Sequence, residues 1–243
     1  MTDFSHKGYL ELLKNIKDSG RPLKSFEGAT GYDGPHVILR HDVDFSLHKA
    51  LEMAQLDHAA GATSTFFILL TAPYYNPLTE EGVQLVKAIA ALGHECGLHY
   101  DCTGFEALTE AQRHRRIQVL ANALEDATGS PVRTIAQHKP AKSAIRQEFP
   151  LYRDAYHDAY FKDMPYISDS RRIFFYHTDV LGFIKQHEKC QLLTHPIWWN
   201  KEPMNIPEIF GQLQGSINAD VSAQLAAEEQ SIDAFFKRNK KQG

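Results

Sequence analysis

The hydrophobic and polar positions of the chain alternate between two periodicities. Short runs rich in β-branched and aromatic residues have the continuous apolar character of strands that are buried on both faces. Between these runs, apolar residues recur every three or four positions, which is typical of helices that pack on such strands. The predicted strands span residues 36–42, 63–71, 95–101, 132–138 and 190–196.

The predicted helices carry start and stop residues. Ser46 and Thr79 can each cap a helix N-terminus, and Gly61 and Gly93 can end the same two helices. The stretch "TEAQ" is a capping box that opens a third, long helix. The predicted helices span residues 46–61, 79–92, 109–129, 179–189 and 219–238.

Strands that alternate with helices of this length predict an α/β fold with a parallel sheet, either open or closed into a barrel. No linker, internal repeat or low-complexity segment divides the sequence. We therefore predict a single domain over residues 1–243, to which an N-terminal and a C-terminal helix are added. Residues 140–175 fit neither periodicity, because Pro150 and Pro165 interrupt them.

Composition narrows the class of protein. The 243 residues are 43% hydrophobic and 23% charged, and the formal net charge of −4 gives no reason to expect a nucleic-acid partner. No apolar run approaches the roughly 18 residues of a membrane span, and no secretory signal is visible at the start. Cys96, Cys102 and Cys190 lack paired spacing, which favours free thiols and a cytoplasmic location. Nothing in the composition predicts an oligomeric state.

Histidines and aspartates stand where the predicted strands end. Asp42 and Asp44 end the first strand, His99 the third, His138 the fourth and His195 the last. In parallel α/β folds the carboxyl ends of the strands meet at one edge, where ligands and catalytic groups gather. We therefore expect these side chains to converge. The alternative is that each lies on an isolated surface turn.

The residue types at this edge indicate metal chemistry. A carboxylate and several imidazoles that converge from different strands form a ligand set for zinc or a similar divalent ion. Such an ion activates water and polarises a carbonyl, while a second carboxylate takes a proton and another histidine protonates the leaving group. Asp42 and Asp44 are two positions apart and so share one face of a strand.

Four segments in this order resemble the polysaccharide deacetylase family of carbohydrate esterases. They are "ILRHDVD", "TSTFFILL", "GHECGLHYD" and "QLLTHP". Their order and spacing match the family from about residue 36 to residue 197, which is most of the chain. The resemblance implies a distorted, incomplete (β/α) barrel. It also implies a divalent ion, and the removal of acetyl groups from N-acetylated sugars or the hydrolysis of related amides.

The resemblance also implies roles for single residues. Asp42 and Asp44 are similar to the base and the metal aspartate of the family's first motif, in a variant with one residue between them. His99 is similar to the first metal histidine of the second motif. His195 is similar to the general acid, and Asp169, in "SDSRR", to the aspartate that orients it.

Two features depart from the family pattern. Thr103 stands where a second metal histidine is expected, and "AQHKPA" (136–141) replaces the usual Arg-Pro-Pro-Tyr-Gly segment. We infer that His138, from a neighbouring strand, replaces the missing ligand. Without it, the site has only two protein ligands for a metal ion.

Other residues near this edge have simpler explanations. Alternation along the strand points His41 away from the aspartates and into packing, and His94 precedes its strand and so lies away from the edge. We expect Arg40 to pair with a nearby carboxylate. Three residues keep two interpretations. Asp101 either lines the pocket or caps the next turn, and Trp198 and Trp199 either stack on a sugar or belong to the core.

The sequence thus predicts a metal-dependent hydrolase that removes an acetyl group from an N-acetylated sugar or a glycan precursor, in carbohydrate metabolism such as surface polysaccharide biosynthesis. No motif of serine hydrolases, P-loop NTPases or dinucleotide-binding proteins occurs. Two alternatives remain open. One is a non-catalytic carbohydrate-binding protein on the same scaffold, and the other is a hydrolase of O-acetyl esters or non-sugar amides.

Overall fold

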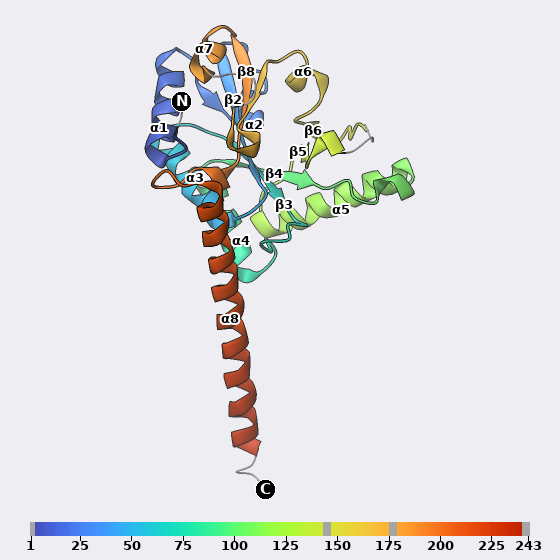
Figure 1. The fold of residues 1–243 in the computed structure, drawn as a ribbon. Helices are drawn as coiled ribbons and strands as arrows, with labels where there is room; N and C mark the ends of the chain where they lie inside the picture. The colour runs from blue at the N-terminus through green and yellow to red at the C-terminus, as the bar shows by residue number, and fades with distance from the viewer. Residues whose placement is uncertain (1–2, 143–146, 175–178, 240–243) are drawn as a thin grey trace. The chain divides into compact units, whose positions relative to one another are not determined.

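The computed structural model describes residues 3–142, 147–174 and 179–239. It divides the chain into two units, Met1–Pro203 and Met204–Gly243 (Figure 1). The first unit holds the sheet and all helices but one, and the second consists mainly of helix α8, Ile206–Asn239. The prediction of a single domain over residues 1–243 stays a prediction.

All strands of the first unit run parallel in one sheet. Along the main path of that sheet the order is β6-β5-β4-β3-β2-β8-β7, and β1 also pairs with β2. The five predicted strands all form, within two residues of the predicted bounds. They are β2 (His36–Val43), β3 (Thr65–Leu69), β4 (Glu95–Tyr100), β5 (Thr134–Gln137) and β8 (Lys189–Thr194).

The remaining strands are too short to produce a periodic pattern. β1 (Leu23–Lys24), β6 (Arg153–Asp154) and β7 (Tyr166–Ser168) have two or three residues each. The last two lie in the stretch 140–175, together with the short helix α6, Asp158–Phe161. Residues 143–146 and 175 of that stretch lie outside the described residues.

Side-chain caps fix the helices largely where the sequence places them. Ser46 accepts from Lys49 N at the start of α3, Thr79 caps α4, and Thr109 forms the predicted capping box of α5 with Gln112. Helix α7 is shorter than predicted, because residues 186–188 form the connection to β8 that the prediction left out. The helix bounds are α1 His6–Asp18, α2 Phe26–Ala29, α3 Leu47–Ala59, α4 Glu80–Ala91, α5 Glu110–Thr128 and α7 Val180–Lys185.

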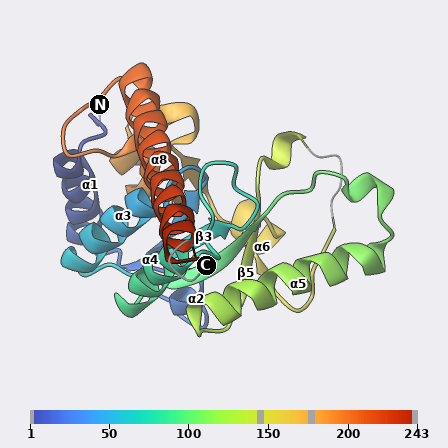
Figure 2. The same cartoon turned by 90° about the horizontal axis from the view of Figure 1, so that it is seen from below.

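The sheet curls into an open barrel. Helices α1, α3, α4 and α5 follow one another around its outer face, each packed on the next (Figures 1 and 2). In the described part of the chain, no ladder joins β6 to β7, so the barrel does not close. This arrangement confirms the predicted distorted, incomplete (β/α) barrel.

The two faces of β2 bury different kinds of side chain. Toward the inside of the barrel, Ile38 belongs to an apolar cluster with Phe67, and Arg40 and Asp42 follow on the same face. Toward the outer helices, His41 stacks on Phe66, with ring centroids 4.4 Å apart. Strand β2 is buried along its whole length, so both faces must satisfy their polar groups within the protein.

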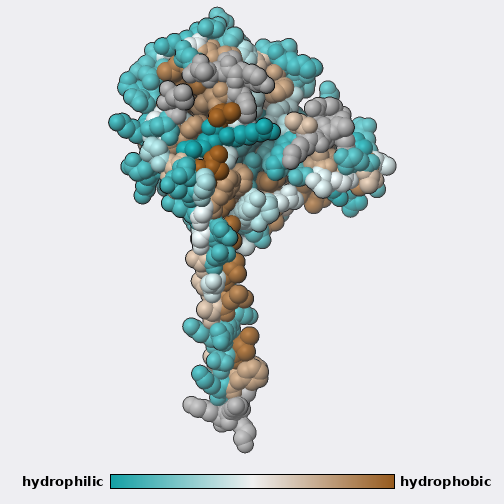
Figure 3. Space-filling view, viewed as in Figure 1, coloured by the Kyte–Doolittle hydropathy of each residue, from teal (hydrophilic) through white to brown (hydrophobic). Residues whose placement is uncertain are grey.

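Helix α8 carries apolar side chains along one side of its length (Figure 3). The exposed ones are Ile206, Phe210, Val221, Leu225, Ile232, Phe235 and Phe236. The helix begins well before the predicted residue 219. No helix in the described part of the chain combines the length and hydrophobicity that crossing a membrane would require.

Candidate functional site

The predicted convergence at the carboxyl edge of the sheet is present. Parallel pairing aligns Leu69 of β3 with His99 of β4, and His99 with Ala136 of β5. On the other side of β2, His41 is level with Thr194 of β8, the residue before His195. The strand ends that carry the predicted residues are therefore neighbours in the sheet.

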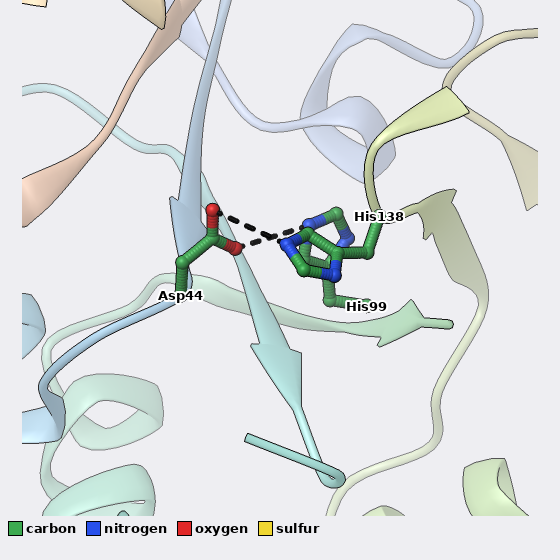
Figure 4. Close-up of side chains that lie close together, drawn as sticks. All are labelled: Asp44, His99 and His138. Carbon is green, nitrogen blue, oxygen red and sulfur yellow. Dashed lines mark ion pairs between the residues drawn. The ribbon is translucent and has the colours of Figure 1, made fainter. Parts of the chain in front are cut away.

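Asp44, His99 and His138 face one another (Figure 4). The distance from His99 Nε2 to Asp44 Oδ1 is 3.3 Å, and from His138 Nε2 to Asp44 Oδ2 it is 3.6 Å. One nitrogen or oxygen atom of each residue lies within 4.8 Å of those of the other two. The three residues predicted as metal ligands thus form a single group.

Hydrogen bonds on the far side of each ring set the orientation of these histidines. His99 Nδ1 donates to the carbonyl of Ala136 at 2.8 Å, and His138 Nδ1 lies 3.4 Å from Asp101 Oδ2. Because a carbonyl and a carboxylate only accept, each Nδ1 carries a proton. In a neutral imidazole, Nε2 then offers a lone pair, which is the arrangement of metal-binding histidines.

The geometry fits a divalent cation. Asp44 Oδ1 and His138 Nε2 are buried and have no hydrogen-bond partner among the described residues. Carboxylate oxygens and imidazole lone pairs are all acceptors, so their approach is unfavourable unless a positive species lies between them. One carboxylate and two imidazoles match the ligands that zinc takes in catalytic sites.

When no metal ion is bound, protons supply the positive charge that these acceptor atoms require. Burial alone lowers the pKa of His99, but Asp42 and Asp44 outweigh it and raise that pKa above its usual value. Burial would also raise the pKa of Asp44, yet the contacts with His138 and His99 hold it well below the usual range. The site attracts positive charge in either form.

Asp42 lies on the same face of β2 but is held differently. Arg40 donates to it from Nε to Oδ1 at 3.1 Å and from Nη2 to Oδ2 at 2.8 Å. Asp42 Oδ2 also lies 3.6 Å from His99 Nε2. The guanidinium of Arg40 is fully buried between the rings of Phe67 and Tyr156. The predicted pairing of Arg40 with a nearby carboxylate is thus present, and it fixes the position of Asp42.

His195 and Asp169 form a second pair beside this group. His195 Nδ1 lies 2.6 Å from Asp169 Oδ1, and His195 Nε2 lies 4.0 Å from Asp44 Oδ2. Burial by itself lowers the pKa of His195, but Asp169 raises it more, to about 9. Trp199 Nε1 donates to Asp169 Oδ2 at 2.9 Å, so Trp199 is a buried residue that holds this pair rather than a sugar-stacking surface.

Asp101 serves as both a cap and a second partner of the site. Its Oδ1 accepts from Thr103 N at 2.6 Å and from the Thr103 hydroxyl, while Oδ2 faces His138. Burial raises the pKa of Asp101, but these donors outweigh it and lower that pKa. Thr103, at the position where the resembled family motif has a second histidine, therefore helps to hold the aspartate that orients His138.

A buried network that sequence reasoning missed lies behind the site. Asp57 of α3 accepts from Tyr9 OH at 2.6 Å and lies 2.8 Å from His41 Nε2. His41 Nδ1 in turn contacts the hydroxyl of Thr194, beside His195, at 2.7 Å. His41 therefore packs away from the aspartates of the site, as alternation predicts. A sequence signal existed, because Asp57 occupies the buried stripe of α3 that includes Met53 and Ala54.

Comparisons with known proteins concern the fold. No protein-family model matches the chain, and no curated protein matches it. A CE4 family pseudoenzyme from Bacillus anthracis is 16% identical, with a TM-score of 0.46; the match covers 77% of this chain and 62% of that one. This chain thus spans less than two thirds of the pseudoenzyme's length.

Two proteins that are named as enzymes show a similar degree of likeness. The polysaccharide deacetylase from Bacillus cereus is 14% identical, with a TM-score of 0.44 and coverage of 76% of this chain and 89% of that one. A family 4 carbohydrate esterase from Streptomyces lividans, in complex with acetate, is 18% identical, with a TM-score of 0.43 and coverage of 76% and 90%.

Proposed function

We propose that the protein is a metal-dependent hydrolase that removes an acetyl group from an N-acetylated sugar or a glycan precursor. The observation that supports this proposal most is that two groups of side chains lie next to each other. One is the Asp44–His99–His138 group with its unpaired buried acceptors, and the other is the Asp169–His195 pair, whose Nε2 lies 4.0 Å from Asp44 Oδ2. A cation site and a proton donor at that separation suit the hydrolysis of an amide.

Asp44, His99 and His138 would hold the ion, which we propose is zinc. When bound, the ion lowers the pKa of water and polarises a carbonyl oxygen. Asp42, which Arg40 holds at the edge of this group, takes the proton of the water that attacks the acetamide carbon. His195 Nε2 then gives its proton to the departing amine, while Asp169 keeps Nδ1 in place.

A non-catalytic carbohydrate-binding protein is the second candidate. It is favoured by Asp42, because both carboxylate oxygens accept hydrogen bonds from Arg40, so lone pairs that would accept the proton of a water molecule are already occupied. A hydrolase of O-acetyl esters or non-sugar amides would use the same residues, since the fold does not decide the substrate. The three cysteines are free and buried, which supports our proposal of a cytoplasmic protein.

Metal analysis and one substitution test this function. We expect protein purified without chelator to hold about one equivalent of a divalent ion and to release acetate from an N-acetylated sugar. Asp42→Asn should lower kcat at least about a hundredfold, the usual contribution of a general base, with the metal content unchanged. A thermal melt must accompany the assay, because the variant leaves the buried Arg40 without its anionic partner.

Each outcome separates the candidates. Near-normal turnover by the folded Asp42→Asn variant contradicts the role of Asp42. Binding of sugar by a protein that holds no metal and releases no acetate supports the binding protein. Release of acetate from O-acetyl esters or small amides, but from no N-acetylated sugar, supports the other hydrolase.

A further inference from the structure

Three aromatic side chains form a wall beside the candidate site. The rings of Phe45 and Tyr74 are stacked, with centroids 5.2 Å apart and planes 22° apart. Trp198 meets Phe45 at 6.1 Å with a tilt of 52°. We call Phe45, Tyr74 and Trp198 the aromatic wall. Tyr74, its outermost member, is 44% exposed, whereas Trp198 is buried.

The chain places this wall between two parts of the site. Phe45 directly follows Asp44, and Trp198 stands three positions after His195, at the end of a single helical turn, Pro196–Trp198. The loop that carries Tyr74 is tied to the same edge, because the hydroxyl of Tyr75 donates to the carbonyl of Val43 and accepts from Leu69 N. The wall thus joins the ends of β2, β3 and β8.

The position of the wall agrees with the direction of the chemistry. An acid must lie next to the atom that departs, so the amine of the leaving sugar belongs on the His195 side. Trp198 follows His195 by three positions, and its ring contacts that of Phe45, which follows Asp44 directly. A sugar ring whose amine lies at His195 would therefore have the aromatic wall as a neighbour.

We propose that the aromatic wall is a stacking subsite for the sugar ring of the substrate, with Tyr74 as its accessible face. This inference rests on the proposed function and adds a substrate class to it: a pyranose ring that presents C–H groups to an aromatic face. A large aromatic side chain offers contact area with little loss of conformational freedom, and ligand sites use such residues together with a few polar groups. Tyr74 leaves 44% of its surface exposed, so the wall is not wholly enclosed in the core.

The test compares two exposed tyrosines. Tyr74→Ala removes the accessible face, and Tyr74→Trp keeps it. Tyr32→Ala is the matched control, because Tyr32 is 38% exposed and packs on His36, at the opposite end of β2. Substrates are N-acetylglucosamine, N-acetylgalactosamine, N-acetylmannosamine and their oligomers, with 4-nitrophenyl acetate as an acetyl donor that lacks a sugar. Calorimetric binding of the same sugars gives a readout without turnover.

We expect Tyr74→Ala to raise KM and Kd for the sugar about three- to tenfold, as the loss of one aromatic contact implies. The effect on KM should exceed the effect on kcat, and turnover of 4-nitrophenyl acetate, which lacks a sugar ring, should fall less than turnover of the sugars. Tyr74→Trp should restore the affinity, and Tyr32→Ala should have no effect.

The results separate the two levels of the proposal. If the wild-type protein cleaves sugars and Tyr74→Ala does so with the same KM and Kd, the stacking subsite is wrong and the proposed function stands. If sugars bind in a Tyr74-dependent way but are never cleaved, the subsite stands and the hydrolase is wrong. If the protein neither binds nor cleaves any sugar of the panel, both are overturned.

Discussion

On each face of β2, an aspartate packs against histidines. The two faces differ in whether all polar atoms of these side chains have hydrogen-bond partners. On the outer face, Asp57 is bonded to Tyr9, His41 and Ser64. On the inner face, Asp44 stands opposite two imidazole nitrogens, and its Oδ1 has no hydrogen-bond partner in the part of the chain that the structure describes.

This difference distinguishes a structural network from a ligand site better than residue type does. Both clusters contain Asp and His, but Asp57 and His41 are fully buried, whereas Asp44 and His138 are half-buried around the buried His99. In the outer cluster, donors and acceptors alternate, so the folded chain completes it. In the inner cluster, acceptors face acceptors, so a ligand or a proton must complete it.

Removing each aspartate in turn is the strongest way to break the comparison. Asp57→Ala should lower the free energy of unfolding by about 3 kcal/mol, because the buried donors of Tyr9, His41 and Ser64 lose their acceptor. Asp44→Ala should abolish metal binding and cost much less stability in the presence of a chelator. Urea denaturation with and without chelator measures both effects.

An exposed aspartate provides the control for both variants. Asp33→Ala should change the free energy of unfolding by less than about 0.5 kcal/mol, since Asp33 lies on the surface. The comparison fails if Asp44→Ala destabilises the chelated protein as strongly as Asp57→Ala does.

A smaller effect is expected from substituting Asp101, which bonds both to a proposed metal ligand, His138, and to the structural residue Thr103. This residue does not reach the cation position, but it accepts from His138 Nδ1 and is itself held by Thr103. Asp101→Asn should therefore weaken the affinity for zinc about ten- to a hundredfold, as substitutions behind a metal ligand do. Competition with a fluorescent chelator measures this affinity.

The control for this substitution is Asp126→Asn, on the exposed side of α5, which should leave zinc affinity unchanged. His138→Ala should lose more affinity than Asp101→Asn. If Asp101→Asn binds zinc as tightly as the wild-type protein while His138→Ala does not, Asp101 only caps its turn.

The arrangement of the site was predictable from the sequence because a topological rule decides it. Parallel strands bring their carboxyl ends to one edge, so Asp44, His99, His138 and His195 meet there whatever the details of packing. The same rule needs no knowledge of which helix covers which face. It also supported the inference that His138 is a ligand, which combined its place at a strand end with the absence of a second histidine at Thr103.

Contacts that depend on packing were beyond that rule. The bonds of Asp57 to Tyr9 and of Trp199 to Asp169 join residues 48 and 30 positions apart. They exist only once the register and the covering helices are fixed. The early start of α8 was hidden by Gly211 and Gly215, which weaken a helical pattern, and by Pro207, which the first turn of a helix tolerates.

The smallest predicted effect is the pH dependence of stability that arises from buried histidines, including His94 of the outer network. His94 Nε2 donates to the carbonyl of Ala54 at 2.9 Å, so Nδ1 must accept from Ser64 N, at 3.3 Å, and the ring must be neutral. Burial accordingly lowers the pKa of His94, and likewise that of His6 and of His36. His195, whose pKa is raised to about 9, acts in the opposite direction near pH 7, because the folded chain already holds this proton and the unfolded chain gains it only as the pH falls through about 6.5. The decline in stability is therefore clearest below about pH 6.

The sign follows from which state binds more protons. Below about pH 6.5 the unfolded chain protonates these three histidines while the folded chain resists, so stability is full above that pH and falls as the pH drops. Each histidine contributes at most about 1.4 kcal/mol per pH unit. Urea denaturation between pH 7 and pH 5 should show this decline in the free energy of unfolding. His94→Gln should reduce the slope of that free energy against pH by up to the contribution of one proton, about 1.4 kcal/mol per pH unit. An equal slope in wild type and His94→Gln would mean that the outer network accepts a charged ring, which removes the distinction drawn between the two faces of β2.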